Sequence, residues 1–342
     1  MPDQKPAAGA EDLLEPEPDL DEAARTEDQL IQAGGTAPAA GALTAATAVE
    51  GGVSEYQASL WGDAWRQLRK KPLFLISAGL LVLFTVIAIA PGLFTSQSPN
   101  LTENPTFCNL SRSVERPQSG HWFGFDIQGC DYYTKVLYGT RVSLTIGLLV
   151  IGIDVLVAIL LGSIAGFFGG FWDGLIGRMA DIWFALPTTL AGIVFLSVLG
   201  KRGLLQVSLV LIFLGWPTLM RLMRSSVLSG KEADYVQAAR ALGASDWRIM
   251  RVHILPNGIA PVIVYATISV GIIISAEAAL SFLGVGLQLP TLSWGLMISA
   301  SQGRILTSPH LLFFPGVFLS VLVLSFIILG DALRDALDPR LR

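Results

Sequence analysis

KEADYVQAARALGASDWRIMRVHILPNGIAP, residues 231–261, is a polar stretch that lies between two long apolar runs of the chain. It has about thirty residues, whereas most connections between helices take roughly 4–6 residues. The stretch is also patterned, because Tyr235, Ala238, Ala239 and Leu242 recur at helical spacing and predict one apolar stripe of a helix. A segment this long and this regular does more than connect its neighbours.

Start and stop signals divide the stretch into two short helices. Ser229 and Glu232 have the spacing of a reciprocal helix cap, and Gly243 favours the left-handed conformation that closes a helix. Ser245 or Asp246 can then begin a second helix. From these residues alone two interpretations stay open: an amphipathic hairpin on a membrane surface, or a docking site for a soluble protein.

The composition indicates an integral membrane protein. Of the 342 residues 52% are hydrophobic and only 15% are charged, against about 25% charged residues in soluble domains. A helix needs about 20 apolar residues to cross a bilayer core. The sequence predicts an all-α membrane protein with six transmembrane helices, in apolar runs at 73–94, 142–168, 182–199, 204–222, 258–285 and 311–330.

Charge is distributed unevenly along the chain. Residues 1–60 carry a net charge of −10, and the remainder carries +6. Residues 1–55 have few large apolar side chains, so we expect an acidic, disordered cytoplasmic tail. Residues 56–72 predict an amphipathic helix on the membrane surface, with Trp61, Trp65 and Leu68 on one side and a basic flank.

Basic residues also predict the topology of the six-span region 73–342. They concentrate before the first span and in the loop 223–257, which places that loop and both termini in the cytoplasm. The segment 95–141 is then extracytoplasmic. Lys201 and Arg202 lie in a predicted external turn and run against the rule.

No catalytic site is predicted. The chain lacks a phosphate-binding loop, a Cys-x-x-Cys pair and a metal-binding cluster, and its three histidines are dispersed. Its two cysteines, Cys108 and Cys130, both fall in the predicted extracytoplasmic segment, where a disulfide would persist. We expect one bridge between them; two free thiols are the alternative.

Two acidic residues inside apolar spans are candidates for the transport path. Asp154 lies in the second span and Glu277 in the fifth, and a charge at that depth costs at least about 2.5–3.5 kcal/mol. Each is therefore expected to face protein, water or a partner. The alternative for both is a structural contact between helices.

Four further residues near span ends have structural interpretations. Arg178 and Asp181 are three residues apart and predict a local ion pair on a helix. Trp172 and Trp294 are interpreted as anchors at the membrane interface.

The central stretch resembles the EAA loop of ABC importer permeases. Gln237-Ala238-Ala239, then Gly243, then Leu255-Pro256 follow the spacing of that motif, with Gln237 in place of its Glu and His253 in place of its Ile. The resemblance implies that residues 244–251 enter a groove on a separate ATPase subunit. The coupling residues it implies are Gln237, Ala238, Ala239, Gly243, Ala244, Ser245, Trp247, Arg248, Leu255 and Pro256.

Further segments, 121–144, 276–295 and 330–342, are similar to the dipeptide/oligopeptide/nickel branch, and to its C-type subunit. This resemblance covers roughly 60–342 and implies the type I ABC importer permease fold in the cytoplasmic membrane of a prokaryote. It implies peptide import by alternating access, with a second permease, one or two ABC ATPase subunits and an extracytoplasmic substrate-binding protein. This chain would itself be non-catalytic and without a cofactor, and ATP and Mg would be used by the ATPase partners. A nickel or other small-solute importer, a proton-coupled secondary transporter and a membrane scaffold remain the alternatives.

Overall fold

The computed structural model of this chain describes residues 60–100, 104, 106–200 and 202–337. The expected acidic tail, 1–55, lies outside these residues. Within the described part the chain is helical, and its only β-type pairings are three isolated bridges. All three lie in the segment from Cys108 to Asp131, which is part of the connection between the first long helix and the second.

Among the described residues, five helical segments are long and apolar enough to cross a membrane, and a bent helix pair gives a sixth if it forms one span. The all-α fold class with up to six spans is confirmed. The five are α3 (Pro72–Ile89), a continuous helix formed by α4 (Tyr132–Val157), η3 (Ala158–Gly162) and α5 (Ser163–Phe168), α8 (Leu204–Lys231), α12 (Ala260–Phe282) and α14 (His310–Leu337).

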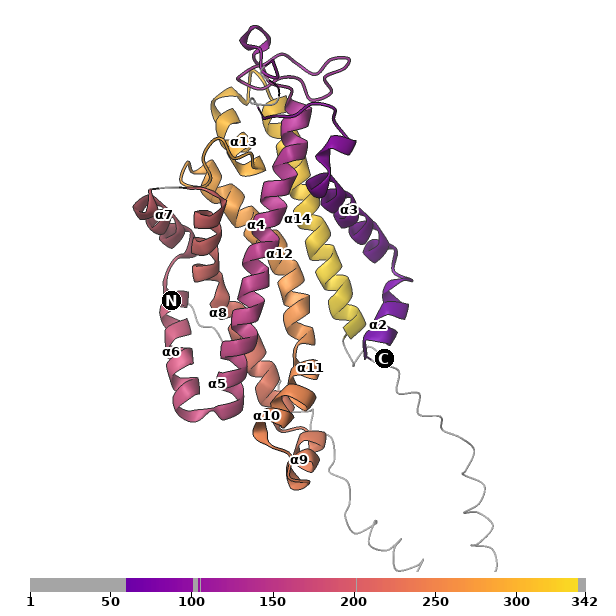
Figure 1. Cartoon of the computed structure of the whole chain (residues 1–342), viewed down its shortest axis with the longest axis vertical. Helices are drawn as coiled ribbons and strands as arrows, with labels where there is room; N and C mark the ends of the chain where they lie inside the picture. The colour runs from indigo at the N-terminus through magenta and orange to yellow at the C-terminus, as the bar shows by residue number, and fades with distance from the viewer. Residues whose placement is uncertain (1–59, 101–103, 105, 201, 338–342) are drawn as a thin grey trace, which may run out of the picture. The chain divides into compact units, whose positions relative to one another are not determined.

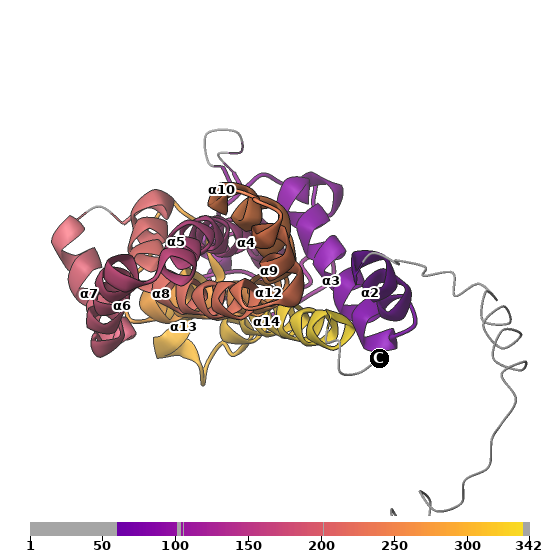
Figure 2. The same cartoon turned by 90° about the horizontal axis from the view of Figure 1, so that it is seen from below.

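The long helices pack around α12, which contacts α4, α8 and α14. Figure 1 and Figure 2 show α4, α12 and α14 at the centre, with α6, α7 and α8 on one side and α2 and α3 on the other. The buried apolar core runs between these central helices. The short α13 (Trp294–Ser301) packs on α12 and α14 near one end, and α9 (Asp234–Ala241) lies at the opposite end.

The third expected span differs from the structure. The apolar run 182–199 predicts one straight helix after a connection at 169–181. Instead α6 (Gly170–Ala185) already begins at the connection, and it meets α7 (Thr188–Leu199) at an angle of 88°. Pro187 lies between the two helices; its ring fixes φ and it offers no backbone N–H, so the first helix ends before it.

The fourth span also extends beyond its predicted end. The apolar run stops at 222, but α8 continues as a helix to Lys231. The predicted cap by Ser229 and Glu232 is therefore wrong: Ser229 lies inside α8, and α9 begins after Ala233 without a side-chain cap. Local capping signals cannot show that a helix already in progress, packed on its neighbours, passes through them.

Proline inside a span leaves a backbone carbonyl without its helical donor, and two neighbouring helices supply one. Pro217 in α8 cannot donate to Phe213 O four residues earlier, and the Trp183 indole of α6 donates there instead, at 2.5 Å. Pro315 in α14 leaves Leu311 O, which accepts from the Tyr132 hydroxyl at 2.6 Å. Both prolines are thus accommodated without ending their helices.

A helix lies within the predicted range 56–72, as α2 (Leu60–Leu68), and it packs on α14. Leu68 is buried beside Phe74 and the alanines of the last turns of α14. Lys71 forms an ion pair with Asp335 at 2.8 Å. The first span is thereby joined to the last at this end of the helical region.

Candidate functional site

The polar stretch folds as a helix, a tight turn and a second helix. α9 ends at Ala241, and Gly243 follows with φ +82°, the left-handed conformation that its sequence position predicts. Gly243 N donates to Arg240 O and Ala244 N donates to Ala239 O, both at 3.0 Å. This is the paired hydrogen bonding of a glycine-terminated helix, and it fixes the direction in which the chain leaves α9.

The second helix is longer than the sequence predicts. It starts as α10 (Asp246–Arg248) and continues through η4 (Ile249–Ile254) and α11 (Leu255–Gly258) almost without interruption into the fifth span. Ser245 is at its N-cap position, but no side-chain hydrogen bond caps the helix there. The turn at Gly243 is consequently attached to a transmembrane helix by a nearly continuous helical segment.

Some residues of this element are buried and attach it to the end of the helical bundle, whereas others are exposed on its surface. Val236, Ile249 and Ile254 are buried in the main apolar core. Leu242 is 89% exposed and Trp247 is 67% exposed, on the two sides of the glycine turn. The predicted stripe is therefore wrong in part, because Val236 takes the inward position and Tyr235 and Leu242 face outward.

The remaining coupling candidates divide in the same way. Ala239, Ala244 and Leu255 are half-buried and pack against the core. The exposed ones are Gln237, Ala238, Ser245, Arg248 and Pro256. The Gln237 amide donates to Glu232 O at 3.0 Å, which joins α9 to the end of α8. The structure thus brings the candidates into one helix–turn–helix element.

Asp154 occupies a different place, in the interior of the helical region. Its side chain is only 1% exposed, and neither carboxylate oxygen has a hydrogen-bond partner among the described residues. It borders a cavity of about 220 Å³ between α4, the α6–α7 bend, α8 and α12. Gly215 of α8 lies directly opposite, since a Cβ there would be 2.6 Å from Asp154 Oδ2.

Glu277, the second transport-path candidate, makes contacts that join two helices. Its Oε1 accepts hydrogen bonds from Ser281 at 2.8 Å and from Ser293 at 3.1 Å. Ser293 is also the N-cap of α13, where it accepts from Leu296 N. Glu277 does not border the cavity beside Asp154. Its geometry favours the structural alternative.

Comparison with known proteins adds the decisive observation. Residues 158–342 match the family model described as binding-protein-dependent transport system inner membrane component, and residues 59–111 match the N-terminal TM domain of oligopeptide transport permease C. The chain belongs to this inner membrane component family. The type I importer permease fold expected from the sequence is that of the family. Its members are non-catalytic membrane components, and separate subunits hydrolyse ATP.

Individual relatives agree with the family model. The permease is 40% identical to a dipeptide transport system permease protein of Alkalihalophilus pseudofirmus, over 83% of this chain and 91% of the relative. It is 36% identical to an oligopeptide transport system permease protein of Bacillus subtilis, over 85% and 93% of the two chains. It is 35% identical to a glutathione transport system permease protein of Pectobacterium atrosepticum, over 82% and 92%.

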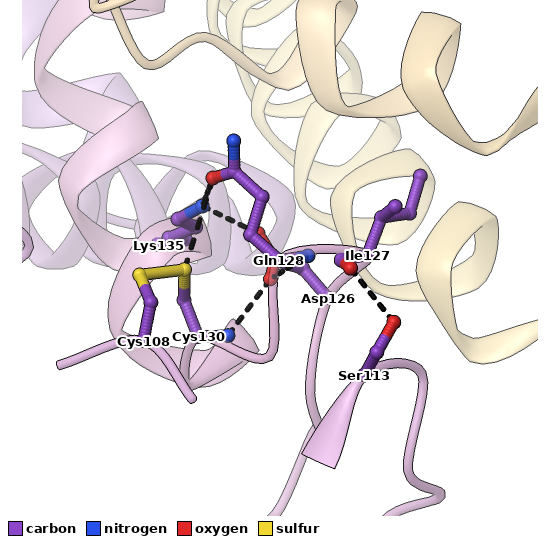
Figure 3. Close-up of a disulfide and its surroundings, with 7 residues drawn as sticks. All are labelled: Cys108, Ser113, Asp126, Ile127, Gln128, Cys130 and Lys135. Carbon is purple, nitrogen blue, oxygen red and sulfur yellow. Dashed lines mark hydrogen bonds and ion pairs between the residues drawn. A yellow bond between two sulfur atoms is a disulfide. The ribbon is translucent and has the colours of Figure 1, made fainter. Parts of the chain in front are cut away.

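At the end opposite the glycine turn, the permease has a compact loop held by a disulfide. Cys108 and Cys130 are bonded to each other (Figure 3). Beside them, the ammonium of Lys135 in α4 pairs with Asp126 and donates to Gln128 Oε1 at 3.1 Å. Asp126 Oδ1 also accepts from Cys130 N at 2.8 Å. The disulfide loop is thus fixed to the first turn of the second span.

Several contacts of the permease were not predicted from the sequence. Asp181 of α6 pairs with Arg221 of α8, so the predicted Arg178–Asp181 pair is wrong. Trp294 is fully buried and donates to Val136 O at 2.9 Å, so it is no interfacial anchor. Arg202, which ran against the charge rule, donates to Gly284 O at 2.8 Å just after α12. Each of these side chains contacts a segment that is distant in the sequence.

Proposed function

We propose that this chain is the C-type permease subunit of an ATP-driven importer that carries peptides across the cytoplasmic membrane of a prokaryote. The observation that supports the cargo class is that relatives spanning more than four-fifths of the chain are named dipeptide and oligopeptide permeases. The relative named for glutathione supports the same class, since glutathione is itself a small peptide.

The helix–turn–helix element from Asp234 to Gly258 is proposed as the point where ATPase movement enters the permease. Exposed Leu242 and Trp247 offer an apolar contact to a protein surface, and buried Ile249 and Ile254 attach the element to the core. Because α10, η4 and α11 lead into α12 with little interruption, a displacement of the turn is transmitted to the fifth span. This arrangement fits alternating access driven by a separate ATPase, which would hold the ATP and Mg.

The family description and the charge pattern support the remaining assignments. A binding-protein-dependent system requires an ATPase and a substrate-binding protein. We place the glycine turn and both termini in the cytoplasm, and the disulfide loop outside, where a disulfide persists. A second, homologous permease completes the translocation pathway.

Purification of the tagged chain from its native membrane tests the proposal. A second permease and ABC ATPase subunits should co-purify, and the complex in lipid nanodiscs should hydrolyse ATP faster with a peptide-loaded binding protein than with the unloaded one. Peptide uptake into vesicles by the isolated chain, driven by a proton gradient without ATP, would refute it.

A further inference from the structure

The carboxylate of Asp154 is the one buried charge-bearing group in the spans whose two oxygens both lack a donor among the described residues. Glu277 is buried as deeply but accepts two hydroxyl hydrogen bonds. A buried ionisable group without a partner is costly, and inside a bilayer it marks a functional site unless something matches it. The match must therefore come from outside the described residues.

The space beside the carboxylate has room for a group larger than a proton or a single water. A single water needs only about 10–15 Å³ of such volume, whereas this cavity has about 220 Å³. Its lining is mostly apolar, and the described residues that form it include no Lys, Arg or His. Four hydroxyl groups supplement the carboxylate: those of Thr188, Thr218, Tyr265 and Ser269. The polar groups can all accept a hydrogen bond, so they suit a cationic donor.

Two features of the surrounding backbone border the carboxylate and the cavity. Gly215 faces the carboxylate, and any side chain there would place its Cβ 2.6 Å from Oδ2. On another side the chain breaks at Pro187, where α6 and α7 meet at 88°. Interrupted helices at this depth line substrate sites in membrane transporters, because irregular backbone is tolerated there only beside a cavity.

We propose that Asp154 binds the protonated amine of the cargo, the ammonium group at the amino terminus of a peptide, during its passage. The inference rests on the proposed function for the class of cargo. The carboxylate supplies the opposite charge, the hydroxyl groups supply further acceptors, and the apolar lining contacts the remainder of the ligand. A peptide whose amine is blocked lacks this charge pair.

Direct binding to the whole transporter tests the proposal. The complex, with the subunits that co-purify, is placed in nanodiscs without its binding protein and titrated with L-alanyl-L-alanine and with N-acetyl-L-alanyl-L-alanine. Hydrogen bonds to charged groups correspond to a difference of about 10- to 100-fold in affinity, so the wild type should prefer the free amine by that factor. Asp154→Asn should lose the preference. Asp181→Asn, a matched change at a carboxylate outside the cavity, should keep it.

A second variant tests the same site without changing Asp154 itself. Gly215→Ala adds a methyl group next to Oδ2 and should also reduce affinity for the free amine. Retention of the wild-type preference in Asp154→Asn would overturn the proposal. Equal wild-type affinities for the two peptides would overturn it as well.

ATP hydrolysis of the same wild-type complex with peptide-loaded binding protein is measured in parallel. If no peptide stimulates it, the proposed function fails. If peptides stimulate hydrolysis but neither probe binds to the wild type, or Asp154→Asn leaves the preference intact, only the inference about Asp154 fails.

Discussion

Substitution of Gly243 tests the effect of the turn's backbone conformation without changing the side chains on the turn's surface. The residue has φ +82°, and a Cβ added there would meet no atom within 4 Å. A side chain at this position therefore causes no collision, and its cost is that of the left-handed backbone alone. For Ala this cost is about 1–2 kcal/mol, and a residue branched at Cβ is disfavoured further. Asn visits the left-handed region more readily and should cost less.

These energies translate into a graded loss of ATPase binding. A penalty of 1–2 kcal/mol reduces the fraction of turns in the docking conformation about 5- to 30-fold, and the apparent affinity falls by the same factor. We expect the order wild type, Gly243→Asn, Gly243→Ala, Gly243→Val, from tightest to weakest. The measurement is the dissociation constant of purified ATPase subunits for the permease in nanodiscs.

The matched control is Gly174→Ala in α6, another glycine with open space around its Cβ position but no positive φ. It should bind ATPase like the wild type. The backbone cost is confined to one exposed turn, so the melting temperatures of the Gly243 variants should fall by only a few degrees. Two results would show that the left-handed turn does not determine docking: wild-type ATPase affinity in Gly243→Val, or a lower ATPase affinity in Gly243→Asn than in Gly243→Val.

Three further predictions concern contacts between helices and the disulfide loop. Trp183→Phe should lower stability by about 1 kcal/mol, but by close to zero in a Pro217→Ala background, because Ala restores the backbone N–H that Phe213 O lacks. A double-mutant cycle of thermal unfolding measures the two costs, and an equal cost of Trp183→Phe in both backgrounds would contradict the prediction. Replacing both Cys108 and Cys130 by Ser opens a loop with a sequence separation of 22 and should destabilise this loop by about 3 kcal/mol. Hydrogen exchange of the loop amides should become faster; exchange at the wild-type rate would show that the disulfide does not stabilise the loop. Glu277→Gln keeps an acceptor for Ser281 and Ser293 and should preserve stability. Glu277→Ala removes the acceptor of both buried O–H donors and should cost about 2 kcal/mol in thermal unfolding; equal losses in the two variants would point to a role for the charge itself.

The sequence was sufficient for the elements that depend on local composition. Apolar runs identified the five spans that form single helical segments. The glycine at position 243 predicted a left-handed turn there, because glycine adopts that conformation at little cost. The resemblance in the loop then grouped residues that the structure places in one helix–turn–helix element. These features need no knowledge of which helices are neighbours.

The errors arise where another helix decides the outcome. Ser229 has the signature of a cap, yet packing carries α8 past it to Lys231. Likewise, the sequence does not predict that Trp183 of α6 donates to the Phe213 carbonyl, which Pro217 leaves without a helical donor. A proline in a span predicts such a carbonyl four residues earlier, but not the residue that donates to it.

The same reason explains the candidate transport site. Asp154 could be singled out from the sequence as a charge in an apolar run. Its lack of a hydrogen-bond partner among the described residues could not, since this depends on which side chains of the neighbouring helices face it. Glu277 is equally acidic and equally buried, and only its contacts with Ser281 and Ser293 distinguish the two residues.

Photo-crosslinking from the glycine turn tests most directly whether a separate ATPase acts on this permease. The chain has two cysteines and both form the disulfide, so a single introduced cysteine carries the label. Trp247→Cys and Trp122→Cys are matched sites, because both tryptophans are 67% exposed and they lie on the glycine turn and on the disulfide loop. With a maleimide benzophenone at each site, our account predicts an ATPase adduct from position 247 and none from position 122. No adduct from position 247, or the same adduct from both positions, would contradict it.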